Sequence, residues 1–126
     1  MIDLHMHTTA SDGRLSPSQL VARAAAAGLT TISVTDHDTV AAYAELTETA
    51  AAAGIRVIPG IEVTAVDEGR DVHVLGYFFD PHSPTLAAVL ERQRALRVSR
   101  VREIAVRLSA LGMSIDVESV LLAAAA

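Results

Sequence analysis

The sequence contains no cysteine, no lysine, no asparagine and no tryptophan. The absence of cysteine excludes disulfides, cysteine-based zinc sites and a thiol nucleophile. The absence of lysine excludes Schiff-base chemistry and a P-loop, so a phosphate group must be bound by arginine, a metal ion or backbone N–H groups. Aromatic residues make up only 3% of the chain and the net charge is −5, which together argue against a sequence-specific nucleic-acid binder.

The chain also lacks long hydrophobic runs. None approaches about 18 uncharged residues, and the N-terminal MIDLHMH has neither the basic nor the apolar part of a secretion signal. We therefore expect no membrane span and a cytoplasmic location. Hydrophobic residues nevertheless make up 51% of the 126 residues, which excludes a disordered chain and suits one domain-sized core.

Hydrophobic periodicity predicts strands that alternate with helices. Residues 1–6 alternate apolar and polar side chains, as in a strand with one polar face. Ser16-Pro17 is a typical helix start, and Gly28 and Gly54 are typical helix ends. The predicted strands are 1–6, 30–35, 55–58, 61–66 and 72–79, and the predicted helices are 19–27, 39–53, 84–111 and 117–124. This order is typical of an α/β fold with mostly parallel strands, and because no closing strand follows the last helix, we expect a truncated sheet.

Histidines and acids recur along these strands and just beyond their ends. His5 and His7 are two positions apart on the first strand, so both side chains leave the same face. The active sites of parallel α/β folds gather at the carboxyl ends of the strands. The other candidate ligands, in chain order, are Asp12, His37, Glu62 and His73. This mixture of imidazole and carboxylate suits Zn²⁺, Mn²⁺ or Fe²⁺, admits Mg²⁺, and predicts two or more ions bridged by a carboxylate such as Glu62.

Each candidate also has a plain structural interpretation. A single histidine on a strand is usually a hydrogen-bonded polar residue, and His37, flanked by two aspartates, also suits a charged loop. Glu62 and His73 are weak signals when taken alone. Asp3 and Asp36 are expected to accept hydrogen bonds from ligand imidazoles; the alternative is that they only solvate strand ends.

Arginines concentrate in residues 92–107, which contain six arginines and only one acidic residue, Glu103. The simplest interpretation is the solvated face of a helix. Arg94, however, falls in the row of apolar side chains on one helical face, where a cation needs a partner. Either Arg94 pairs with a buried carboxylate, or it points into the site and, with Arg97 at the edge of the same face, binds a second substrate phosphate. Arg14 in the first loop is a further phosphate-binding candidate.

Four motifs combine the candidate residues. In chain order they are His5-Met6-His7-Thr8 with Ser11-Asp12-Gly13, Thr35-Asp36-His37-Asp38, Pro59-Gly60-Ile61-Glu62, and His73-Val74-Leu75-Gly76-Tyr77. Together they resemble the PHP (polymerase and histidinol phosphatase) family of metallo-phosphoesterases over nearly the whole chain. The resemblance implies a distorted (βα)7 barrel with a trinuclear metal site. Residues 1–82 would be the N-terminal βα units of this barrel, and residues 83–126, a long Arg-rich helix and a short terminal helix, would begin an inserted helical region.

The resemblance also implies a role for each candidate ligand. Glu62 and His37 are the expected catalytic residues. The implied ligands are His5 and His7 for a first ion, Asp12 and His37 for a second, and Glu62 as a bridge from the first ion to a third that His73 also binds.

Within the family, the motifs look most like the phosphoesterases of nucleoside 3′,5′-bisphosphates. The implied reaction is hydrolysis of a phosphomonoester of a small nucleotide by a metal-bound hydroxide, with two or three divalent ions. The alternatives are a histidinol-phosphate phosphatase and a metal-stabilised module without catalysis. The family takes further ligands from later strands, so this chain alone is expected to bind metal weakly or to be inactive.

Overall fold

The computed structural model describes residues 1–125, and the chain divides into two compact units, Met1–Leu86 and Ala87–Ala126. The assignment of residues 1–82 and 83–126 to a barrel portion and an inserted region stays a prediction. The elements are β1 (Ile2–Met6), α1 (Pro17–Ala26), β2 (Thr31–Val34), α2 (Tyr43–Ala52), β3 (Arg56–Val57), β4 (Gly60–Asp67), β5 (Arg70–Tyr77), α3 (Pro84–Ala110) and α4 (Val117–Ala125).

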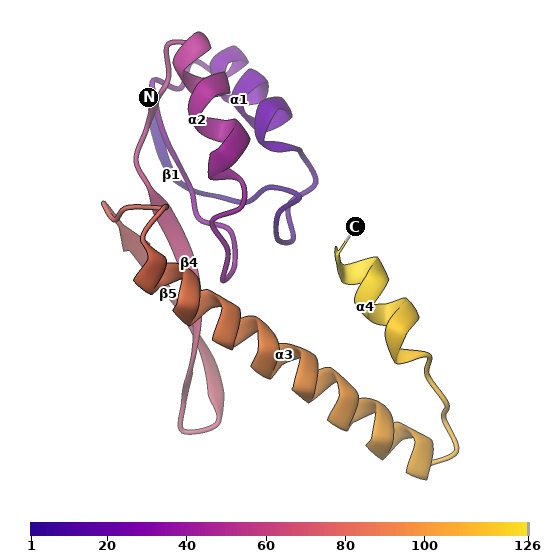
Figure 1. Ribbon diagram of the computed structural model, residues 1–126. Helices are drawn as coiled ribbons and strands as arrows, with labels where there is room; N and C mark the ends of the chain where they lie inside the picture. Colours follow the sequence, from indigo (N-terminus) through magenta and orange to yellow (C-terminus); the bar gives the residue numbers. More distant parts are fainter. Residues whose placement is uncertain (126) are drawn as a thin grey trace. The chain divides into compact units, whose positions relative to one another are not determined.

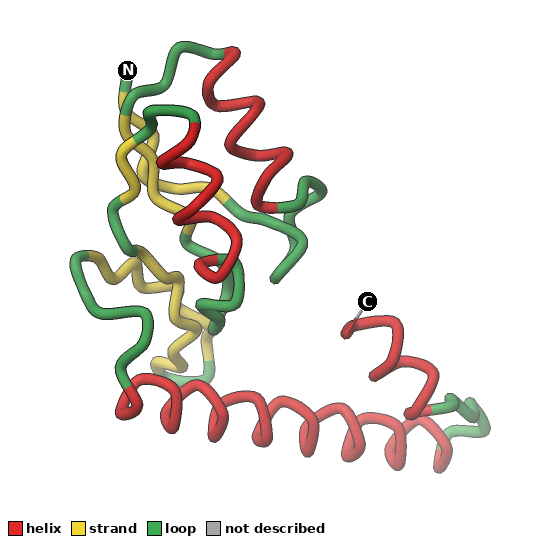
Figure 2. Tube along the Cα trace, turned by 45° about the horizontal axis from the view of Figure 1, so that its top comes forward, coloured by secondary structure: helices red, strands yellow, loops and turns green. Residues whose placement is uncertain are grey.

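The first unit is built on three parallel strands in the order β1-β2-β3. Thr31 of β2 pairs with Ile2 of β1 on one side and with Arg56 of β3 on the other. The helices α1 and α2 lie side by side against this sheet (Figures 1 and 2). This arrangement confirms the α/β class with parallel strands that the alternation of strands and helices predicts.

The hydrophobic core lies between β2 and the two helices. Ile32 and Val34 of β2 are completely buried, as are Val21 of α1 and Leu46 of α2 at 1% exposure or less. Burial of side chains of this size contributes about 1.5–3 kcal/mol each. By contrast, Ile2 on β1 is 63% exposed, so the sheet is packed mainly through its central strand.

The helix α1 begins where the sequence predicts. The Ser16 hydroxyl accepts a hydrogen bond from the Gln19 N–H, and the Gln19 side chain accepts one from the Ser16 N–H, which completes a capping box. The helix α2 begins at Tyr43, four residues later than the start predicted at residue 39. The helix cannot begin directly after Asp38, because Asp38 has a positive φ of 51° and its N–H donates to the Glu62 carbonyl of β4.

Tyr43 joins the first turn of α2 to the ends of two strands. Its buried hydroxyl donates to the Val34 carbonyl at 2.8 Å and accepts the Gly60 N–H at 2.6 Å. A Cβ atom at Gly60 would lie 2.1 Å from the Ser33 hydroxyl oxygen, so only glycine permits this approach. The end of β2 and the start of β4 are thereby fixed to the same side chain.

The strands β4 and β5 form an antiparallel hairpin. Glu68 and Gly69 at its turn both have positive φ, which is typical of the tight two-residue turns that close hairpins. So short a connection cannot make a parallel crossover. The strand predicted over residues 72–79 therefore does not extend the parallel sheet: it pairs antiparallel with β4, and His73 lies within it, opposite Thr64.

The segment after β2 lies against β4 through a parallel bridge between His37 and Glu62. The Glu62 N–H donates to the Asp36 carbonyl at 3.3 Å, and the Asp38 N–H donates to the Glu62 carbonyl at 2.9 Å. The Asp38 carboxylate also accepts the Thr64 N–H at 2.9 Å. The backbone thus holds the residues after β2 beside the first half of β4.

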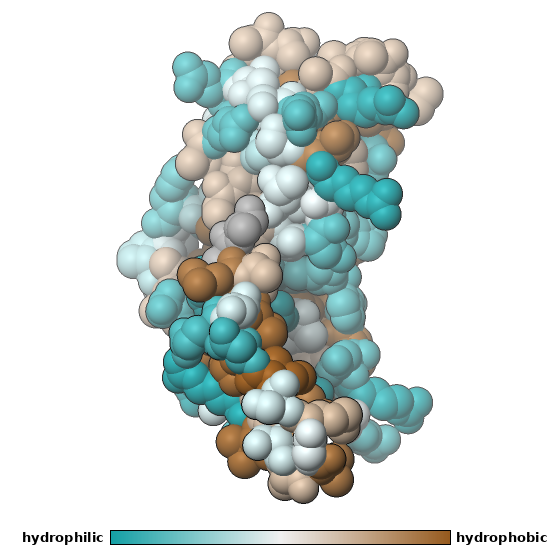
Figure 3. All heavy atoms as spheres, turned by 90° about the vertical axis from the view of Figure 1, so that its right-hand side faces the viewer, coloured by the Kyte–Doolittle hydropathy of each residue, from teal (hydrophilic) through white to brown (hydrophobic). Residues whose placement is uncertain are grey.

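The second unit contains most of α3 together with α4. After α3, Gly112 adopts a positive φ of 81°, as is common where a helix ends. Arg102 of α3 and Glu118 of α4 form an exposed ion pair at 3.6 Å. Figure 3 shows hydrophobic atoms at the surface here, where Leu111 and Leu122 are more than 70% exposed. Across residues 1–125, no helix has the length and hydrophobicity needed to cross a membrane.

Candidate metal centre

The candidate ligands come from four elements of the first unit. His5 lies on β1 and His7 directly follows this strand, and the two share one face because side chains two positions apart in extended chain point the same way. His37 follows β2 and is brought to β4 by the parallel bridge to Glu62. His73 on β5 is opposite Thr64, two residues beyond Glu62, so it is a diagonal neighbour of Glu62 on the same face of the hairpin.

Glu62 is the centre of the cluster. Its Oε2 atom lies 2.8 Å from His5 Nε2 and 3.1 Å from His7 Nε2. Its Oε1 atom lies 2.7 Å from His73 Nδ1 and 3.9 Å from His37 Nδ1. One buried carboxylate therefore has four imidazoles around it, contributed by residues 5 to 73 of the chain.

Asp12 supplies a second carboxylate on the outer side of the cluster. Its Oδ1 atom lies 3.2 Å from His7 Nδ1, and its Oδ2 atom lies 3.7 Å from His37 Nε2. The Asp12 side chain is 68% exposed, whereas that of Glu62 is 7% exposed. The two acids thus bracket His7 and His37, one from the interior and one from solvent.

The surroundings of Glu62 favour its charged form. Burial alone would raise the pKa of this carboxyl, but hydrogen bonds with His5 and His73, together with positive charge at His37 and His5, lower the pKa below the ordinary value of 4.5. A carboxylate that stays ionised in a nearly buried position suits a ligand for cations.

The donor set fits divalent metal ions. Within residues 1–125, the buried Nδ1 atoms of His7 and His37 make no hydrogen bond, although buried polar atoms are usually paired. Three groups of potential ligand atoms each lie within 4.8 Å of one another. These groups are His5, His7 and Glu62; His7, Asp12 and His37; and His37, Glu62 and His73. Nitrogen and oxygen donors in this mixture suit Zn²⁺, Mn²⁺ and Fe²⁺.

The two aspartates expected to orient imidazoles hold backbone and hydroxyl groups in this structure. The Asp3 carboxylate accepts the His5 N–H at 3.1 Å. The Asp36 carboxylate accepts the Thr8 N–H and the Thr8 and Ser11 hydroxyls. Sequence patterns gave no sign of these partners, because Asp36 lies 28 positions from Thr8 and meets it only through packing.

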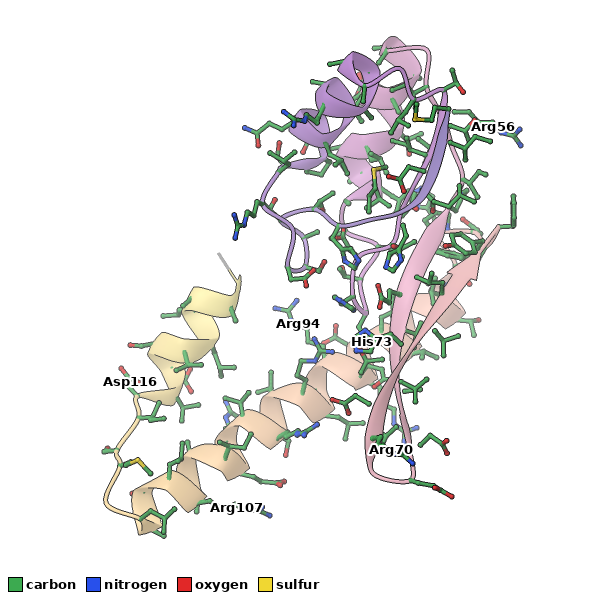
Figure 4. The ribbon with its side chains drawn as sticks, turned by 180° about the vertical axis from the view of Figure 1, so that it is seen from behind. Arg56, Arg70, His73, Arg94, Arg107 and Asp116 are labelled. Atoms are coloured by element: carbon green, nitrogen blue, oxygen red, sulfur yellow. The ribbon has the colours of Figure 1, made fainter. Side chains whose placement is uncertain are left out.

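The arginines expected to bind phosphate are all exposed. Arg14 lies in the loop before α1, in the same unit as the cluster. Arg94 and Arg97 lie on α3 in the second unit, where Figure 4 labels Arg94. Arg70, at the start of β5, lies toward the hairpin turn, away from His73. The phosphate-binding role of these arginines stays a prediction.

Several named proteins are similar to this chain. A 5′-3′ exoribonuclease from Haemophilus influenzae is 44% identical over 111 residues, which cover 88% of this chain and 40% of the relative. A 3′,5′-nucleoside bisphosphate phosphatase from Chromobacterium violaceum is 39% identical over 113 residues, which cover 90% of this chain and 40% of the relative. The chain therefore spans about 40% of the length of these curated relatives.

Solved structures show the same fold. An amidohydrolase from Chromobacterium violaceum with bound sulfate matches with a TM-score of 0.80 and 38% identity, over 93% of this chain and 41% of that one. A protein from Bifidobacterium adolescentis described as a metal-dependent phosphoesterase matches with a TM-score of 0.76 and 38% identity, over 86% of this chain and 38% of that one. The PHP domain model matches residues 3–121, so this chain belongs to the PHP domain family.

Proposed function

We propose that this chain forms the metal-binding part of a metal-dependent phosphoesterase that hydrolyses a phosphomonoester of a small nucleotide, a nucleoside 3′,5′-bisphosphate. The observation that carries the proposal is the convergence of four imidazoles and two carboxylates from separate elements into three overlapping ligand groups. Membership of the PHP domain family and the similarity to a protein described as a metal-dependent phosphoesterase support it.

The proposed ligands are the six residues of the cluster, and two or three Mn²⁺, Fe²⁺ or Zn²⁺ ions are the proposed cofactors. Such ions would supply hydroxide at neutral pH and offset the charge of the phosphoryl group. Glu62 and His37 are the proposed catalytic residues; like His7, each belongs to two of the three ligand groups. With no cysteine or lysine in the sequence, this chain contributes neither a thiol nor a lysine amine as a nucleophile.

Glu62 and Asp12 would have different roles, because their side chains differ in solvent exposure. Glu62 is nearly buried and its pKa is lowered, so it provides a fixed negative charge between imidazoles. Asp12 is mostly exposed, so the side of the cluster that it borders is open to a substrate. A phosphate that approaches from this side would meet the metal positions shared by His7 and His37.

The proposed substrate follows from the similarity to the Chromobacterium violaceum protein named for nucleoside 3′,5′-bisphosphates. A bisphosphate has a second phosphate that needs its own cationic partner. In a chain without lysine, arginine is the side chain that can provide one, and a guanidinium binds phosphate with two parallel hydrogen bonds. Arg14, Arg94 and Arg97 are the proposed partners.

A second candidate function is the removal of nucleotides from the 5′ end of RNA. The relative named as a 5′-3′ exoribonuclease is 44% identical, against 39% for the relative named as a bisphosphate phosphatase. The six arginines of residues 92–107 also suit a longer polyanion. Both reactions would use the same metal centre. They differ in the length of the substrate, which is a single nucleotide in the first and an RNA chain in the second.

Phosphate release and product analysis separate these functions. The chain, and a longer protein that contains it, would be assayed with added Mn²⁺ on a nucleoside 3′,5′-bisphosphate, a 5′-phosphorylated oligoribonucleotide and histidinol phosphate. Faster phosphate release from the bisphosphate supports the first proposal, and stepwise shortening of the oligoribonucleotide supports the second. Mn²⁺ binding that raises Tm without turnover of any substrate would contradict both and indicate a metal-stabilised module.

A further inference from the structure

Asp36 is a buried acid that does not belong to the ligand cluster. It is 1% exposed, and a carboxylate in such a position must be compensated by hydrogen bonds. It accepts three short ones: from the Thr8 N–H at 2.7 Å, from the Thr8 hydroxyl at 2.6 Å and from the Ser11 hydroxyl at 2.6 Å. All three donors belong to the loop that leads from β1 to Asp12.

This loop is closed tightly around the groups that Asp36 holds. The N–H groups of Ser11 and Gly13 both donate to the Thr8 carbonyl, at 3.1 and 2.8 Å. A Cβ atom on Gly13 would lie 2.3 Å from the His7 carbonyl oxygen, so the loop folds directly onto the end of β1. Thr8 is completely buried, which makes it the fixed base of the loop.

Asp12 has no comparable anchor of its own. Its side chain is 68% exposed, and apart from the two imidazoles its contact is with the Ser11 hydroxyl, at 3.3 Å from Oδ1. The Ser11 hydroxyl has one proton and lies 2.6 Å from Asp36, so that proton goes to Asp36. The position of Asp12 is therefore set by its backbone, and the backbone is set by Asp36.

We propose that Asp36 is a positioning residue for the metal ligand Asp12. Its carboxylate fixes Thr8 and Ser11, so that the Asp12 carboxylate stands beside His7 and His37 before a cation arrives. The inference rests on the proposed metal centre and adds to it a residue that touches neither metal nor substrate.

The test is a set of single and double variants of the whole chain, titrated with Mn²⁺ to obtain stoichiometry and Kd. Asp12→Ala removes the ligand. Asp36→Ala removes all three acceptor contacts, and Asp36→Asn keeps one acceptor oxygen and a polar group of the same size. Ser11→Ala removes one contact from a partly exposed position, so it serves if Asp36→Ala does not fold. Amide hydrogen exchange at Thr8 and Gly13 reports the order of the loop without metal.

We expect Asp36→Ala to lose one Mn²⁺ equivalent or to weaken its binding by about 10–100-fold, the usual effect of residues that support ligands. Asp36→Asn should stay within about threefold of wild type, and Ser11→Ala should weaken binding about threefold with Tm nearly unchanged. The decisive comparison is the double variant: if Asp36 acts through Asp12, adding Asp36→Ala to Asp12→Ala costs no further affinity.

Two results would overturn the inference while leaving the metal centre intact. One is wild-type Mn²⁺ affinity in Asp36→Ala or in Ser11→Ala although Thr8 and Gly13 exchange faster. The other is an equal loss of affinity from Asp36→Ala with and without Asp12, which would indicate a general structural role. If the wild-type chain bound no Mn²⁺ at all, the proposed metal centre itself would fall, and the role of Asp36 with it.

Discussion

The Nε2 atom of His5 lies 2.8 Å from the Oε2 atom of Glu62, although 57 positions separate the two residues. This contact joins β1 of the parallel sheet to β4 of the antiparallel hairpin. It exists because the segment after β2 lies between them and forms the bridge from His37 to Glu62. The ligand cluster is thus a product of how the two sheets of the first unit meet.

Replacing Glu62 with glutamine should weaken Mn²⁺ binding by at least about tenfold, because a neutral amide takes the place of the carboxylate between the imidazoles. The matched control is Glu68→Gln, the same substitution in an exposed hairpin turn. Calorimetric titration with Mn²⁺ measures both variants. Equal affinities in the two variants would show that Glu62 is not a ligand.

Replacing Tyr43 with phenylalanine should lower the free energy of unfolding by about 1–3 kcal/mol, because the Gly60 N–H and the Val34 carbonyl lose their buried partner. Tyr77→Phe is the control, since its hydroxyl makes one exposed hydrogen bond to the Leu4 carbonyl. Urea denaturation of both variants gives the comparison. If Tyr77→Phe were the more destabilised of the two, the role given to Tyr43 would be wrong.

Alkaline pH should destabilise the metal-free chain through Tyr43. Burial raises the pKa of this phenol above its ordinary value of 10.0, although the hydrogen bond with the Gly60 backbone lowers it in part. A raised pKa means that the stabilisation is complete below about pH 10 and is lost as the pH rises through the folded-state pKa. With no lysine in the sequence, few other groups titrate in this range.

The check is a series of urea denaturations from pH 8 to 11 on the wild type and on Tyr43→Phe. The wild-type free energy of unfolding should fall above about pH 10, and the variant should show a flatter dependence. Parallel curves for the two proteins would assign the alkaline loss to other groups.

Arg94 should matter more for substrates with two phosphates than for substrates with one. In a longer protein that contains this chain, Arg94→Ala should raise KM for a nucleoside 3′,5′-bisphosphate by about tenfold or more, since a bidentate guanidinium–phosphate contact is lost. Arg107→Ala on the same helix is the control. An equal rise of KM for a nucleoside monophosphate would remove Arg94 from the recognition of the second phosphate.

Much of the cluster could be predicted because its residues obey local rules. The two-residue spacing of His5 and His7 puts them on one face of a strand, and His37 follows a strand whose carboxyl end could be located from the TTISV pattern. Glu62 followed from the Pro59-Gly60 signal before a strand. In each case the place of the candidate ligand relative to a strand can be predicted from short-range patterns in the sequence.

The rest depends on contacts that no short-range pattern contains. The turn at Glu68 and Gly69 reverses β5, so His73 reaches Glu62 across a hairpin rather than from the end of a parallel strand. Asp36 was expected beside an imidazole, but packing brings it to Thr8 and Ser11. Asp36 meets these partners because the loop after β1 folds back onto the segment after β2. That fold depends on the packing of the whole first unit and not on any short stretch of sequence.

Anomalous diffraction from crystals of this chain grown with Mn²⁺ would locate the cations themselves. We predict two or three anomalous peaks among the six side chains, with one bounded by His5, His7 and Glu62 and one by His7, Asp12 and His37. Peaks only at other places in the chain, or none in a folded crystal soaked with excess Mn²⁺, would contradict the claim that these residues form a metal centre.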